Sequence, residues 1–172
     1  TNFTDSLLVG HATSGTLNAA TDNTGVGIDA LDALTSGDHN TAVGSKALSA
    51  AADTTANTAV GKDALRLATG SYNTAIGYQA SEANTSGSSN IALGVNALTG
   101  NETGNYNTAL GYQGLDSVTS HRNIGIGYQA GQNITTGAGN IIIGTADAAA
   151  ADSARTFKVV SYDGSTTTNH II

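Results

Sequence analysis

The sequence contains no cysteine, proline, methionine or tryptophan, and only two of its 172 residues are phenylalanine. Without cysteine the chain has neither a disulfide framework nor a thiolate metal cluster. Six Lys and Arg residues against thirteen Asp and Glu residues give a net charge of −7, which argues against nucleic acid and anionic membranes as partners. No apolar run approaches the ~20 residues that span a bilayer, so we expect no membrane insertion. The chain begins with Thr1 and no signal-peptide pattern follows, so we expect a fragment of a longer protein.

Large apolar side chains are also scarce. Val, Ile, Leu and Phe supply 33 of the 172 residues, whereas Ala, Thr, Gly and Asn together make up more than half of the chain. Such a composition is at the level where disorder would be expected. It leaves two options, a disordered linker or a repeat architecture whose core is thin by construction.

An internal repeat decides between these options. A pentapeptide that ends in glycine recurs nine times, and the interval from one closing glycine to the next is about 17 residues throughout, never differing by more than one position. A disordered chain needs no such register, so we exclude disorder. The closing glycines are Gly10, Gly27, Gly44, Gly61, Gly77, Gly94, Gly111, Gly127 and Gly144.

The repeat unit reads N-T-A-(V/I/L)-G-x-x-A-L, followed by a stretch of polar or small residues. A unit of this length is too short for the helix pairs of α-solenoids, which need repeats above ~30 residues. A short apolar segment between Asn and Gly is typical of a strand that ends in a turn. The sequence therefore predicts an all-β fold, a parallel β-solenoid or β-roll of about nine coils. We call the part of each coil that follows the closing glycine its arm. The arms after Gly27, Gly44 and Gly61 also fit one helical turn, so we expect the arms to be mixed, some with a helical turn and some without.

Side chains alternate between the two faces of a strand. In the strand Asn40–Gly44, Thr41 and Val43 share one face, while Asn40 and Ala42 share the other. In the equivalent strands both the Val43 and the Ala42 columns are free of charge. We expect one column to fill the interior of the coil and the other to pack against identical chains, with three-fold closure as a natural solution. The alternative is a single-chain solenoid that encloses both columns.

Asn and Gly at the two ends of each strand are expected to be turn residues. The Asn side chain can bond the neighbouring backbone and the Asn amide in the next coil, and Gly accommodates a positive φ. The clearest such pairs are Asn40 and Gly44, Asn57 and Gly61, Asn73 and Gly77, and Asn107 and Gly111.

In register, these repeats resemble the head repeats of trimeric autotransporter adhesins and, equally, those of bacteriophage tail fibres and tail spikes. The matching elements are Ala42-Val43-Gly44 and Ala75-Ile76-Gly77 with a small residue three places later, and the resemblance covers about Ser6–Gly144. It implies an intertwined homotrimer of left-handed parallel β-rolls in a surface fibre. The coils are longer than the compact adhesin repeat, and the sequence Gly-Tyr-Gln-Ala, which ends in Tyr78-Gln79-Ala80, is closer to the phage repeats. The shared motif contains no catalytic residue.

Two columns suggest ligands. Five of the six tyrosines belong to the repeats, all beyond Gly70, and an aromatic strip with neighbouring amides suits sugar rings. The alternative is that these tyrosines stack on one another or pack between subunits. The Thr column around Thr41 is similar to that of ice-binding solenoids, although isoleucines interrupt it. The candidate glycan-binding residues are Tyr78, Gln79, Tyr112, Gln113, Tyr128 and Gln129.

No pattern supports catalysis or metal binding. The four histidines share no ligand spacing, the Asp residues lack the calcium nonapeptide repeat, and neither a carboxylate pair nor a nucleophile–base pair recurs. We therefore expect no enzyme, no cofactor and no metal site.

We expect three regions: residues 1–22 as an N-terminal cap and first coil, residues 23–144 as the repeat solenoid, and residues 145–172 as a C-terminal cap or junction. Asp163-Gly164 in the last region is typical of a hairpin turn. The predicted function is a stiff spacer and host-attachment module of a phage tail fibre or bacterial adhesin, on a virion or bacterial cell surface. Its expected partners are copies of itself and a cell-surface polysaccharide or protein receptor. A carbohydrate-binding module and an ice-binding solenoid are the alternatives.

Overall fold

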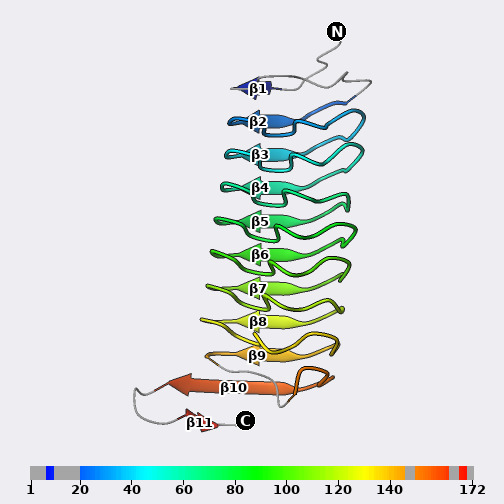
Figure 1. The fold of residues 1–172 in the computed structure, drawn as a ribbon. Coiled ribbons are helices and arrows are strands. Elements are labelled where there is room, and N and C mark those ends of the chain that lie inside the picture. Colours follow the sequence, from blue (N-terminus) through cyan, green and yellow to red (C-terminus); the bar gives the residue numbers. More distant parts are fainter. Residues whose placement is uncertain (1–6, 10–19, 146–149, 163–166, 170–172) are drawn as a thin grey trace.

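The computed structural model describes residues 7–9, 20–145, 150–162 and 167–169. In these residues the protein is all-β, a parallel β-solenoid of about eight turns drawn out as a rod, with β1 and β11 at opposite ends (Figure 1). The strands are β1 (Leu7–Val9), β2 (Thr24–Val26), β3 (Thr41–Val43), β4 (Thr58–Val60), β5 (Thr74–Ile76), β6 (Ile91–Leu93), β7 (Thr108–Leu110), β8 (Ile124–Ile126), β9 (Ile141–Ile143), β10 (Phe157–Tyr162) and β11 (Thr167–Asn169).

All eleven strands form one sheet in sequence order, and β1 to β10 pair in parallel. The pairing follows the sequence repeat, since Thr41, Ala42 and Val43 of β3 lie opposite Thr58, Ala59 and Val60 of β4. The same register holds from β4 to β5 and from β7 to β8, where the repeat is one position shorter, so this difference is absorbed outside the strand. Each column of the sequence alignment is therefore a column of the rod.

The arm that follows each strand contains no helix in the described part of the chain, so the expectation of a mixed arm is wrong. Two of its residues in each coil have a positive φ, for example Lys46 at 60° and Leu48 at 51°. Alternating left-handed residues cannot belong to an α-helix, and each costs about 1–3 kcal/mol. Hydrogen bonds to the neighbouring coils offset that cost, such as Lys46 N–H to the Ile28 carbonyl at 2.8 Å and Leu48 N–H to the Ala64 carbonyl at 3.0 Å. No helix among the described residues can therefore cross a membrane.

The core is a narrow set of columns inside the coils. The middle residue of each strand from β2 to β9 is buried, in most coils together with an alanine and a leucine from the arm, such as Ala42, Ala47 and Leu48 in one coil. The side-chain volumes in the leucine column of the arm and the alanine column of the strand compensate each other in the last coils. Gly131 stands where most coils have leucine, and Ile142 stands where most strands have alanine. A Cβ at Gly131 would lie 3.5 Å from Cγ1 of Ile142, so the larger residue fills the space that the smaller one leaves.

The asparagine at the head of each strand is buried and joins the coils, as the sequence predicts. Asn57 N–H donates to Oδ1 of Asn40 at 3.0 Å, and Asn73 N–H donates to Oδ1 of Asn57 at 2.8 Å. Nδ2 of each Asn reaches across its own coil, as Asn57 does to the carbonyl of Gly70 at 3.0 Å. The same Oδ1 ladder runs from Asn23 to Asn140, and Asn107 belongs to it. Each Asn side chain is thus hydrogen-bonded both within its own coil, through Nδ2, and to the next coil, through Oδ1.

The glycine that closes each strand from β2 to β9 has a positive φ, as expected, with 133° at Gly44 and similar values at Gly61, Gly77 and Gly111. A second constraint comes from the stacking. A Cβ built on Gly44 would lie 2.6 Å from the carbonyl carbon of Gly61 in the next coil. Any side chain at this position is therefore excluded by both the backbone conformation and the distance between coils.

At the C-terminal end, β10 continues the parallel sheet, with Phe157 opposite Ile141, and β11 then pairs antiparallel with β10. The antiparallel pairing is that of a hairpin, but the predicted turn at Asp163-Gly164 lies outside the described residues. At the other end, β1 pairs with β2, and most of the predicted cap over residues 1–22 also lies outside them.

Candidate functional site

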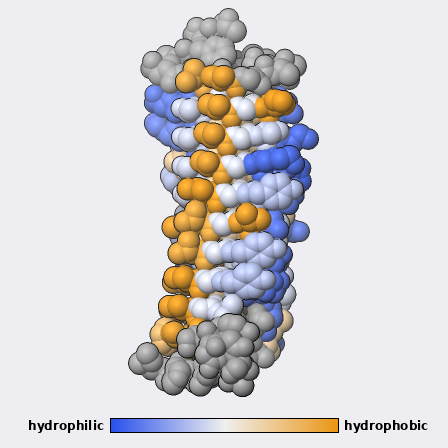
Figure 2. Space-filling view, turned by 90° about the vertical axis from the view of Figure 1, so that its left-hand side faces the viewer, coloured by the Kyte–Doolittle hydropathy of each residue, from blue (hydrophilic) through white to orange (hydrophobic). Residues whose placement is uncertain are grey.

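An apolar column runs along the outside of the rod, at the last residue of each strand. Figure 2 views the side on which the strands end and shows an orange strip that extends over the described coils. Side chains in this column are 37–40% exposed at Val26, Val43, Ile76, Leu93 and Leu110, and half-buried at Val60, Ile126 and Ile143. The prediction that one column fills the coil interior is therefore confirmed for the Ala42 column. The alternative in which a single chain encloses both columns is wrong.

The first residue of each strand shares this outer face, so a Thr column lies beside the apolar column. Thr41, Thr58 and Thr74 are half-buried, and Ile91 in the same column is exposed. Isoleucine also takes this position at Ile124 and Ile141, which leaves the Thr array interrupted in the C-terminal half. Ice binding by this face stays a prediction.

The candidate glycan residues lie in the two positions that follow the closing glycine. Tyr112 and Tyr128 stack face to face, with ring centroids 5.4 Å apart and an angle of 10° between the planes. Beside them, Nε2 of Gln129 donates to Oε1 of Gln113 at 2.9 Å. These four residues form a ladder in which aromatic faces and amides bond one another. The geometry is that of the stacking alternative, because the ring faces that a sugar would need are partly covered.

Tyr78 and Gln79 lie in the same two columns but two coils away from Tyr112 and Gln113. Val95 and Asn96 stand between them. On its other side, Nζ of Lys62 lies 5.4 Å from the centroid of the Tyr78 ring. The structure therefore brings together four of the six predicted residues and separates Tyr78 and Gln79 from the rest.

The remaining two tyrosines form a separate column. Tyr72 and Tyr106 precede the asparagine at the start of their strands, whereas Tyr78, Tyr112 and Tyr128 follow the glycine at the end. The expectation of one strip made of five tyrosines is therefore wrong, because the length of the strand separates the two columns. Tyr72 and Tyr106 are 64% and 59% exposed, compared with 44% for Tyr78 and 43% for Tyr112.

A group of charged side chains on the arms was not found from the sequence, because its members come from different coils. Nη2 of Arg66 lies 2.7 Å from Oε1 of Glu82, and Nζ of Lys62 lies 2.9 Å from Oδ2 of Asp63. The hydrogen bond and the charge of the Asp63 carboxylate raise the pKa of Lys62 above its ordinary value of 10.5. Lys62 is exposed, so this pair contributes little to stability.

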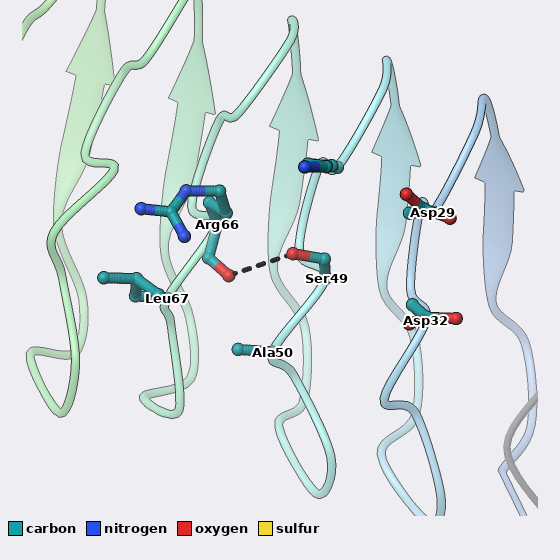
Figure 3. A pocket seen from close by; sticks show the side chains of 7 residues that line it. Asp29, Asp32, Ser49, Ala50, Arg66 and Leu67 are labelled. Atoms are coloured by element: carbon teal, nitrogen blue, oxygen red, sulfur yellow. Dashed lines mark hydrogen bonds between the residues drawn. The ribbon is translucent and has the colours of Figure 1, made fainter.

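Beside this group is a shallow hollow of about 310 Å³ across the arms that follow β2, β3 and β4 (Figure 3). Ser49 Oγ donates to the carbonyl of Arg66 at 3.3 Å across it. Both carboxylates come from the arm after β2, whereas the two cations come from the arms after β3 and β4, so opposite charges balance across the hollow and favour a ligand of neither charge. It is lined by Asp29, Asp32, Lys46, Ser49, Ala50, Arg66 and Leu67.

Comparison with known proteins finds no family model, no curated protein and no solved structure that matches this chain.

Proposed function

We propose that the chain is a rod-forming module of an extracellular fibre, either a phage tail fibre or a bacterial surface adhesin, and that it assembles as a homotrimer through the apolar column of its strands. The observation that carries the proposal is the outer column at Val26, Val43 and their equivalents, which stays apolar in every strand from β1 to β9 although the chain itself does not cover it.

Selection for folding alone does not require this column to be apolar. The Ala42 column must be apolar and small because the coil encloses it. The Val43 column faces outward, where a polar side chain would cost the single chain little. A continuous apolar strip on a protein surface is typical of an interface. Identical chains are the partners that offer a strip of the same length and the same repeat.

Because the strands are stacked in one rigid rod, the small gain from burying one apolar side chain per strand adds up along the rod. Full burial of Val, Leu or Ile contributes about 1.5–3 kcal/mol, so covering the ~40% that remains exposed contributes about 1 kcal/mol per strand. One strand cannot offset the about 4–15 kcal/mol cost of association, whereas eight strands held in one rigid row reach that range. Cyclic closure about an axis parallel to the rod covers the strip on every chain, and three-fold closure is the arrangement that the resemblance to adhesin and tail-fibre repeats implies.

The mechanical role follows from the same geometry. The backbones of neighbouring coils are hydrogen-bonded in both the strands and the arms, so the rod has few points at which it can bend. Three such rods in contact make a stiff spacer with a repetitive lateral surface. Such a spacer on a virion or bacterial surface carries a receptor-binding surface away from the body of the particle.

Light scattering of the purified chain tests the proposal. One chain has a mass of 17.0 kDa, and we expect the wild-type particle to have three times this mass. We expect Val60→Asp to leave a folded monomer, because an aspartate in the outer column is hydrated in the monomer but would be buried without a partner in the assembly. The matched control is Ser86→Asp, an exposed position on the arm, which should keep the mass of the wild-type protein. A wild-type particle with the mass of a single chain, or a trimer of Val60→Asp, would exclude this interface.

A further inference from the structure

Tyr72 and Tyr106 occupy equivalent positions two coils apart, and a short residue stands between them. The three residues before the asparagines Asn73, Asn90 and Asn107 are Tyr72, Ser89 and Tyr106. Their backbones are alike, with φ of 63°, 58° and 60°, so their side chains leave the rod in the same way. Neighbouring strands are ~4.8 Å apart, which separates the two tyrosine positions by about 9.6 Å along the rod.

The ring faces in this column are arranged differently from those in the Tyr112 column. The guanidinium carbon of Arg122, one coil further on, lies 5.6 Å from the centroid of the Tyr106 ring and covers one of its faces. The opposite face of Tyr106 is directed toward the coil of Ser89. In the other tyrosine column the equivalent middle position is Val95, an exposed apolar side chain that fills the space between Tyr78 and Tyr112. Ser89 is much shorter, and Tyr72 and Tyr106 on its two sides are more exposed than Tyr78 and Tyr112 on the two sides of Val95.

We propose that Tyr72 and Tyr106 hold a β-gluco-configured pyranose, glucose or N-acetylglucosamine, between their rings, in the space that the short side chain at position 89 leaves open. Carbon atoms in contact are about 3.5–4.0 Å apart, so a flat ring between two tyrosines needs about 7–8 Å. The separation of about 9.6 Å between the two positions suits a thicker, puckered ring. C–H bonds carry a small positive charge and are attracted to the negative face of an aromatic ring.

The geometry also sets the specificity. A β-gluco pyranose has only axial C–H bonds on both of its faces, so both faces can pack on tyrosine. A galacto pyranose directs its axial oxygen at C4 toward one of the rings. That oxygen is a hydroxyl at the non-reducing end and carries the next sugar within a 1,4-linked chain, and in both cases it prevents this face from packing on tyrosine. At the rim, the hydroxyls of Tyr72 and Tyr106 are the polar groups for the equatorial hydroxyls of the sugar. Ser89 contributes only its small size, and Asn105 Oδ1 already accepts from Ser88 N–H at 2.7 Å.

This inference deepens the adhesive part of the proposed function, but the site lies within one chain and does not depend on the trimer. Filling the gap is the sharpest test. Ser89→Tyr places a third ring between Tyr72 and Tyr106, and its backbone φ is one that both tyrosines already adopt. Ser89→Ala keeps the gap open and is the matched control. Tyr128→Ala removes a ring from the other column and controls for nonspecific loss of aromatic surface.

Binding of cellotetraose, and of galactotetraose with the same linkage, is measured by NMR titration at millimolar sugar. We expect the wild type to bind cellotetraose about tenfold or more tightly than galactotetraose. Ser89→Tyr and Tyr72→Ala should each weaken cellotetraose binding about tenfold or more, while Ser89→Ala and Tyr128→Ala stay within about twofold of the wild type. Circular dichroism of each variant controls for folding, and Val60→Asp should bind like the wild type whatever its mass. No binding of cellotetraose by the wild type, equal binding of the two sugars, unchanged binding by Ser89→Tyr, or an equal loss in Tyr128→Ala would overturn the proposal.

Discussion

The inner and outer faces of strands β2 to β9 are made from neighbouring residues of the same tripeptides, and they obey different constraints. On the inner face the middle residue is alanine or glycine in seven strands, and the one isoleucine, Ile142, is accompanied by Gly131 in the adjacent column. In the outer apolar column, at the last residue of each of these strands, Val, Ile and Leu replace one another, but no polar residue occurs. The inner column is thus limited in volume by the coil around it, whereas the outer column is limited only in polarity. An interface with another chain would require apolar side chains in the outer column but would not require them to be as small as those inside the coil.

A charge on the inner face should have the largest effect. Ala59 is completely buried in the core, so Ala59→Asp should lower the free energy of unfolding by about 4 kcal/mol or more, or prevent folding. Denaturant titration followed by circular dichroism measures this loss. The comparison is Val60→Asp, one residue away on the outer face, which should stay folded and exceed Ala59→Asp in free energy of unfolding by about 3 kcal/mol or more. If both variants lost the same stability, the two faces would not differ as described.

The polar part of the inner face should come next. Asn73 Oδ1 accepts from Asn90 N–H at 3.0 Å, and its Nδ2 donates to the Gly87 carbonyl at 2.9 Å, all in buried surroundings. Asn73→Ala leaves the buried Asn90 N–H without its acceptor and removes one of the two hydrogen bonds to the Gly87 carbonyl, which also accepts from Asn84 Nδ2 at 3.1 Å. This loss should cost about 3 kcal/mol in the free energy of unfolding. Thermal and urea unfolding measure the change. Ser86→Ala on the exposed arm is the control, and an equal midpoint for the two variants would contradict the structural role of the Asn ladder.

The smallest effect should come from carboxylates on the outer surface of the coils. Hydrogen bonds from the backbone N–H and the hydroxyl of Thr21 hold the pKa of Asp38 below its ordinary value of 3.8, and those from Ser36 and Thr35 do the same for Asp53. A carboxyl group whose pKa is lower in the folded than in the unfolded state stabilises the fold above the unfolded pKa, and this stabilisation is lost as the pH falls through the folded pKa.

The midpoint of thermal unfolding should therefore decrease slightly between pH ~5 and pH ~2.5. The double variant Asp38→Asn, Asp53→Asn retains oxygen acceptors but no longer titrates at these positions, so its midpoint should change less over the same interval. An equal decrease in the wild type and the double variant would assign the acid sensitivity to other carboxylates.

Most of the fold could be predicted because each coil needs the same few residues at the same points. Gly44 and its equivalents are required by a positive φ and by the carbonyl of the next coil, and Asn57 and its equivalents by the hydrogen bonds of the ladder. Both requirements recur once per coil, which is why the strand bounds and their register follow the repeat. The arm was misread as mixed because Leu31 and Leu34 have helical spacing, whereas the chain there is held by hydrogen bonds to the neighbouring coils.

The candidate surfaces were harder to predict. The sequence places Tyr72 and Tyr78 close together along the chain, and only the strand between them shows that they belong to different columns. The stacking of Tyr112 on Tyr128 and the interruption at Val95 required the register of the coils, and the charged group around Arg66 required contacts between coils.

The sequence by itself determined that the chain is a parallel stack of short strands, because a period kept over nine repeats has a physical use only if equivalent residues lie above one another. The tertiary structure alone decided which of the two apolar columns is enclosed. Alternation along a strand assigns residues to two faces but does not say which face is inside; the path of the arm, with Leu48 turned inward against Ala42, places alanine in the narrow interior and leaves valine on the surface.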